Sequence, residues 1–144
     1  MNNASFDPAR FLEAQENVYA NVLDELSAGS KVSHWIWFIF PQLAALGRSS
    51  TARFYGLADK TEARAYVEHP VLGKRLRECS ELLLSIQGRT ATQIMGSPDD
   101  LKLCSSMTLF EAAQPEEPVY GAVLGHLYGD TRDKLTLERL QGRS

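Results

Sequence analysis

SHWIWFIFPQ, residues 33–42, is the stretch that decides the fold of this chain. Its middle, residues 35–40, is apolar on both faces, whether it is read with the period of a strand or of a helix. A segment that is hydrophobic all round is expected to be buried on all sides. It is also far shorter than the roughly 18 apolar residues that a membrane-spanning helix needs. We therefore interpret it as a core segment.

The pattern of this segment does not by itself distinguish a strand from a helix. A buried strand needs hydrogen-bonding partners, and the chain has neither a second alternating run of strand length nor an Asn-Gly hairpin turn. The stretch is therefore predicted to be a short buried helix. Ser33 is its expected cap, and Pro41 ends it because proline disfavours helical geometry at Phe40.

The flanking sequence carries repeated helix signals. Asp7-Pro8 combines a capping residue with a proline at the first helical position, and apolar residues then recur at helical spacing until Gly29. The same reasoning predicts helices over residues 59–69, 70–87, 91–95, 98–114 and 118–128, and a last one that starts near Asp130 or Asp133. The sequence thus predicts an all-α fold, a single compact domain of about six to eight helices over residues 1–144, with no significant β-sheet and with residues 1–6 and 142–144 as loose ends.

Length, charge and motif content narrow the classes of protein to which the chain could belong. A chain of 144 residues and 16.0 kDa is expected to fold around one core. Its formal charge of −3, with scattered Lys and Arg, argues against a nucleic-acid-binding surface. The first residues show no secretion signal, so a cytoplasmic location is expected, with Cys79 and Cys104 reduced and buried. No paired His or Cys spacing predicts a metal, and no motif predicts a cofactor.

Five long motifs occur in order along the chain: HWIWFIFPQ, LGRSSTARFYGL, EARAYVEHPVLGKRL, KLCSSMTLFEAA and GDTRDKLTLERL. With them the chain resembles the bacterial domain-of-unknown-function family 1810, a group of small, mainly helical proteins. The resemblance covers nearly the whole sequence and implies the same all-helical fold, but no activity. Members are sometimes labelled calpastatin-like, which would predict a disordered polar inhibitor. A hydrophobic content of 44% argues against that label here.

The segment GRSST, residues 47–51, is the first candidate for binding. It places Arg48 and three hydroxyls at the expected entrance to a helix, where free backbone N–H groups favour a phosphate or a carboxylate. Ser49 and Ser50 are equally suited to plain helix capping. The segment lacks the Gly-Lys-Ser/Thr ending of a Walker loop.

A second group of polar residues follows in LKLCSSMTLF, residues 101–110. Lys102, Ser105 and Ser106 share one face of the predicted helix, beside an apolar face. The serine hydroxyls could instead bond to the preceding helical turn. A Ser–Lys nucleophile pair would need a lysine with a depressed pKa and an oxyanion site.

The ends of the aromatic stretch complete the site hypothesis. His34 could act as a general acid or base or as a donor in an aromatic-walled pocket, or it could be a buried residue bonded to backbone. We expect a pocket for a small anionic ligand, lined by His34, Trp35, Trp37, Gln42, Arg48, Ser49, Ser50, Lys102, Ser105 and Ser106. The alternatives are a non-catalytic interaction or structural protein, of open oligomeric state, and a hydrolase acting through Ser105 or Ser106 with Lys102 or His34.

Overall fold

The computed structural model describes residues 6–141. Within this range the chain forms ten α-helices and one short 3-10 helix, and it contains no strand, only an isolated bridge between Leu43 and Leu57. The all-helical prediction is confirmed. Of the expected loose ends, residues 1–6 and 142–144, all but Phe6 lie outside the described residues, and Phe6 packs against the rings of Phe11 and Tyr66.

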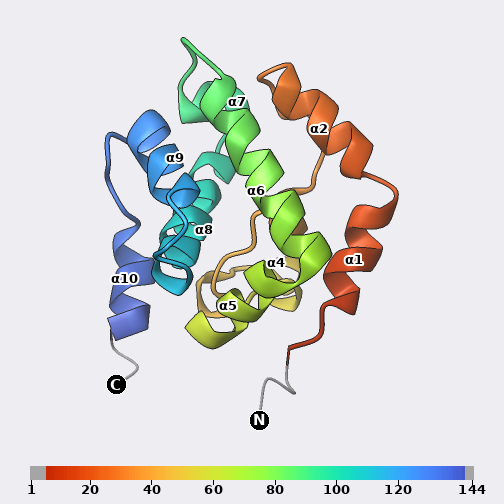
Figure 1. Cartoon of the computed structure of the whole chain (residues 1–144), viewed down its shortest axis with the longest axis vertical. Coiled ribbons are helices and arrows are strands. Elements are labelled where there is room, and N and C mark those ends of the chain that lie inside the picture. The colour runs from red at the N-terminus through yellow and green to blue at the C-terminus, as the bar shows by residue number, and fades with distance from the viewer. Residues whose placement is uncertain (1–5, 142–144) are drawn as a thin grey trace.

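The helices follow one another closely along the chain (Figure 1). They are α1 (Ala9–Glu16), α2 (Tyr19–Ser27), α3 (Ile36–Ile39), the 3-10 helix η2 (Ala44–Leu46), α4 (Ser50–Phe54), α5 (Lys60–Glu68), α6 (Pro70–Ser85), α7 (Ala91–Met95), α8 (Asp99–Ala113), α9 (Val119–Tyr128) and α10 (Lys134–Gln141). Their number exceeds the expected range, partly because the first predicted helix breaks at Asn17-Val18. The break lets α1 and α2 turn their own buried residues to the core.

Helix α8 is the centre of the fold. All eight residues from 103 to 110 are buried, and α8 packs against α5, α7, α9, α10 and α3. Figure 1 shows it enclosed between α9, α10 and the green helix α6. A buried helix usually carries polar residues where they find hydrogen-bond partners or face a cavity, and Ser106, buried with no described partner for its hydroxyl, is an exception on α8.

The aromatic segment forms part of the core, as expected, but its helix is shorter than predicted. Only residues 36–39 are helical, and Trp35 occupies the capping position without a side-chain cap. Ser33 is not the cap, because its hydroxyl donates to Glu25 at 2.6 Å instead. Phe40, just before Pro41, has left the helical region at φ −125° and ψ 72°, which agrees with the effect expected of proline.

The loop after Pro41 is fixed by a close backbone contact. The Leu57 N–H donates to the Gln42 carbonyl at 2.9 Å, and the Ala44 N–H donates to the Leu57 carbonyl at 2.8 Å. Gly56 permits this approach, since a Cβ there would lie 2.3 Å from the Ala44 Cα. The contact holds residues 42–49 over α8, and these residues form one wall of the cavity described next.

Candidate functional site

A surface cavity of about 580 Å³ lies where the loop before α4 meets α8 and α10. Five residues singled out from the sequence line it together: Gln42, Arg48, Ser49, Lys102 and Ser105. The rest of its lining is Ala45, Leu46, Gly47, Ala52, Pro98, Leu101, Asp133, Leu135 and Arg139. Residues more than 90 positions apart in the sequence therefore meet in this cavity, which we call the α8–α10 cavity.

Local structure explains how these side chains reach the cavity. Lys102 and Ser105 are three residues apart on α8 and so lie on the same helix face, as predicted. Arg48 precedes α4, and the Ser49 hydroxyl caps that helix by accepting from the Ala52 N–H at 3.1 Å. Arg139 comes from the last turn of α10. The sequence left open whether Ser49 caps a helix or lines a binding site. In the structure it caps α4 and also lines the cavity.

The charge of the cavity is predominantly positive. In the part of the lining that the structure describes, Arg48, Lys102 and Arg139 stand with one carboxylate, that of Asp133. Asp133 caps α10, because its Oδ2 accepts from the Thr136 N–H at 2.9 Å and from the Thr136 hydroxyl at 2.6 Å. Within residues 6–141, none of the three cations forms an ion pair.

A narrow recess of about 10 Å³ adjoins the cavity and shares Gln42, Ala52 and Lys102 with it. Its other walls are Ile36, Phe40 and Trp37. The Lys102 ammonium lies 5.5 Å from the centroid of the Trp37 ring, which is a cation–π contact. Of the two tryptophans proposed as a wall, Trp37 is the one beside the cavity.

Four of the predicted site residues lie elsewhere. His34 is exposed in the turn before α3, so the alternative of a buried histidine is wrong, and it is not among the residues that line this cavity. Trp35 is buried and donates from Nε1 to Glu25 at 2.8 Å. Ser50 is exposed at the start of α4. Ser106 is fully buried in the core, and its Oγ has no hydrogen-bond partner among the described residues.

The arrangement offers little to a serine nucleophile. Ser106 is out of reach of any substrate, and the Ser105 hydroxyl donates to the Leu101 carbonyl at 3.2 Å. No histidine lines the described part of the cavity: His69 caps α6, and His126 bonds to the Ile86 carbonyl. Among residues 6–141, Ser105 therefore has no histidine beside it in the cavity to act as a general base.

Residues 5–140 match the model of a family described as protein of unknown function (DUF1810). The chain belongs to this family. It is also similar to a crystal structure of the conserved hypothetical protein Rv1873 from Mycobacterium tuberculosis, with 48% sequence identity, a TM-score of 0.93, and coverage of 94% of this chain and 97% of that one. No curated protein matches the chain. The family match agrees with the resemblance drawn from the motifs, and the Rv1873 structure has the same fold.

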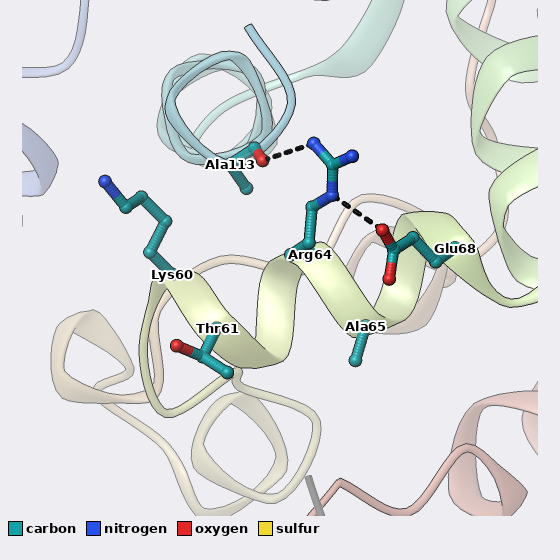
Figure 2. A pocket seen from close by; sticks show the side chains of 6 residues that line it. All are labelled: Lys60, Thr61, Arg64, Ala65, Glu68 and Ala113. Atoms are coloured by element: carbon teal, nitrogen blue, oxygen red, sulfur yellow. Dashed lines mark hydrogen bonds and ion pairs between the residues drawn. The ribbon is translucent and has the colours of Figure 1, made fainter. Parts of the chain in front are cut away.

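This DUF1810 chain has another cavity, of about 310 Å³, at α5 (Figure 2). Its most prominent cation is already engaged. The Arg64 guanidinium bonds to Glu68 at 2.8 Å, to Glu116 at 2.7 Å and to the Ala113 carbonyl at 3.1 Å. Because two carboxylates neutralise Arg64, Lys60 is the cation of the described lining that has no ion pair, and this cavity is a weaker candidate for an anion than the α8–α10 cavity, which has three such cations.

Three further observations concern metal ligands, membrane-spanning helices and the two thiols. Within residues 6–141, no three His, Cys, Asp or Glu side chains are grouped so that they could hold a metal ion. None of the described helices is long and apolar enough to cross a membrane. Cys79 and Cys104 are free and buried, as expected, and burial raises the pKa of the Cys79 thiol to about 12.

Proposed function

We propose that this protein binds a small anionic ligand, one that carries a phosphate or a carboxylate, in the α8–α10 cavity. One observation carries the proposal: three cations without a described ion pair line one cavity of a chain whose formal charge is −3. Asp133, whose carboxylate is in the described lining, is already bonded to Thr136. Gathering free positive charge in one concavity favours an anion there, because the ligand then supplies the missing partners.

The neutral residues of the cavity support the same ligand class. Gln42 and Ser105 add hydrogen-bonding groups beside the cations, and Leu46, Leu101 and Leu135 provide apolar surface for the uncharged part of a ligand. A volume of about 580 Å³ falls within the range of roughly 300–1,000 Å³ that is usual for small-molecule sites. A ligand larger than a bare phosphate would be needed to fill it. We also propose that the protein binds this ligand in the cytoplasm, the location expected from the sequence.

An interaction protein is the alternative that one observation favours. Leu101 and Leu135 line the cavity, and they are 64% and 59% exposed. Exposed leucines beside a concave surface are also typical of a protein interface. A concentration-dependent mass in solution that changes on substituting Leu101 and Leu135 with polar residues would support this alternative instead.

Calorimetric titration with phosphate, sulfate and simple carboxylates tests the binding proposal. Arg48→Ala is the diagnostic variant, and Arg53→Ala is its matched control, because Arg53 is an exposed arginine of α4 that does not line the cavity. We expect Arg48→Ala to weaken binding about tenfold or more, since a charge-assisted hydrogen bond contributes about 1.5–3 kcal/mol. Arg53→Ala should bind like the parent. The proposal fails if no anion of either class binds, or if both variants weaken binding equally.

A further inference from the structure

A second cavity adjoins the first across the side chain of Arg139. Its volume is about 520 Å³, and it shares Arg139 and Ala45 with the α8–α10 cavity. We call it the α5–α10 cavity, because Asp59, Lys60 and Thr61 at the start of α5 line it together with Leu140 of α10. Arg139 therefore stands between two concave spaces of similar size.

The α5–α10 cavity has a second cation beside Arg139, namely Lys60, which also lines the α5 cavity of Figure 2. Within residues 6–141, Lys60 takes part in no ion pair, and Figure 2 shows its side chain extending away from Arg64 and Glu68. Among the described residues of this lining the acid is Asp59, whose Oδ1 accepts from the Glu62 N–H at 2.9 Å as the cap of α5. The pattern of the first cavity recurs: the carboxylate serves as a helix cap, and the cation has no described acid partner.

We infer that the ligand is elongated and carries two separate anionic groups, one held by Arg48 and Lys102 and the other by Lys60, with Arg139 between them. This inference rests on the proposed function and specifies its ligand class. A single phosphate would leave the second cavity and Lys60 unused. Leu43 and Leu140 in the second cavity, like the leucines of the first, suit an uncharged linking part.

The test compares the affinities of alkane bisphosphonates of increasing chain length with those of alkyl monophosphonates of the same length. The chain length that binds best measures the separation of the two anion sites. Two linked anions bind with a gain in affinity only when the linker spans the two sites. We expect one chain length to bind at least about tenfold more tightly than its monophosphonate. Lys60→Ala should remove that gain and leave monophosphonate binding intact. Lys74→Ala is the matched control, since Lys74 is an exposed lysine of α6 outside both cavities.

The outcomes separate the two proposals. If monophosphonates bind in an Arg48-dependent way but no bisphosphonate binds more tightly, the two-anion ligand is wrong and the anion site stands. If a gain occurs and survives Lys60→Ala, the second group does not bind where we infer, and the inference is overturned. If neither series binds, the two-anion ligand is wrong, and the calorimetric titration with phosphate, sulfate and carboxylates decides separately whether the proposed function fails. Circular dichroism of each variant shows that a loss of binding is not a loss of fold.

Discussion

The ammonium of Lys102 lies 5.5 Å from the centroid of the Trp37 ring, at the boundary between the α8–α10 cavity and its narrow recess. Within the described residues, Lys102 has this aromatic partner but no acidic one. A cation–π contact contributes about 0.5–2 kcal/mol, less than a charge-assisted hydrogen bond can. The Lys102 ammonium can therefore move from the Trp37 ring to a bound anion at modest cost in free energy. This movement would change the environment of the Trp37 indole.

Tryptophan fluorescence should report anion binding through Trp37. We expect phosphate to change the emission of the parent protein, because the bound anion draws the Lys102 ammonium away from the indole ring. Lys102→Met should weaken phosphate binding about tenfold, since it removes one cation and keeps most of the stem. Lys134→Met, at the exposed start of α10, is the matched control and should bind normally.

Trp37→Phe tells a local response from a global one. Trp35, the other tryptophan, is buried and donates to Glu25, so it should contribute a constant background. The emission change should vanish in Trp37→Phe while calorimetric binding of phosphate persists. An emission change that survives in Trp37→Phe would contradict the proposed movement of Lys102.

Glu25 should make the stability of the protein depend on pH in acid. Burial opposes its ionisation, but hydrogen bonds from Ser33, Val32 and Trp35 outweigh burial and lower its pKa from 4.5 to about 2. A carboxylate with a lowered pKa stabilises the fold above its unfolded pKa, and this stabilisation is lost as the pH falls from about 4.5 towards 2. The cost of Glu25→Gln should therefore be largest near neutral pH and shrink across this window.

Urea unfolding of the parent and of Glu25→Gln at a series of pH values measures this effect. We expect a difference in the free energy of unfolding of about 1 kcal/mol at neutral pH, because partial solvent exposure screens the carboxylate. Glu16→Gln, an exposed position at the end of α1, serves as the control and should show little difference at any pH. If the difference in the free energy of unfolding stayed constant from neutral pH down to pH 2, the charge of Glu25 would not be what stabilises residues 32–35.

The fold was predictable because most helix boundaries depend on local chemistry. Asp59 and Thr90 cap helices through bonds within three residues, and Gly129 ends α9 in the left-handed region at φ 59°. The cap assigned to Ser33 was wrong for a non-local reason: Glu25, eight residues earlier, takes its hydroxyl. Such competition between partners depends on tertiary packing, which a single sequence does not reveal.

The site was predictable only in part, because local spacing along a helix indicates which residues share a face but not whether that face lies at the surface or in the core. Spacing on one helix grouped Lys102 with Ser105, but it grouped them equally with Ser106, whose position is in the core. Arg139 was missed, because a basic residue in the last turn of a helix is already explained by the helix dipole. Only the folding of α10 against α8 brings Arg139 to Arg48 and Lys102.

Two buried hydroxyls of α8 should respond in opposite ways to removal. Ser106 Oγ has no described partner, so Ser106→Ala should leave stability unchanged or raise it by up to about 1 kcal/mol. Thr108 Oγ1 donates to the Cys104 carbonyl at 2.8 Å and accepts from the Asp133 N–H at 2.9 Å. Thr108→Val should cost about 1–3 kcal/mol, because it strands the Asp133 N–H. Thermal unfolding measures both, and a destabilising Ser106→Ala would reveal a hydrogen bond at that hydroxyl.

Gly56 should be indispensable to the wall of the α8–α10 cavity. A Cβ at this position would lie 2.3 Å from the Ala44 Cα, a backbone atom that cannot move without breaking the Leu43–Leu57 bridge. Gly56→Ala should therefore destabilise the protein by about 1–3 kcal/mol and weaken anion binding through displacement of Arg48.

Gly125→Ala is the matched control. There the nearest obstacle is the exposed carboxylate of Asp130, which can rotate away, and alanine suits the interior of α9 better than glycine does. We expect Gly125→Ala to be neutral or stabilising in urea unfolding, and an equal loss of stability in both variants would show that the close approach at Gly56 is not the cause.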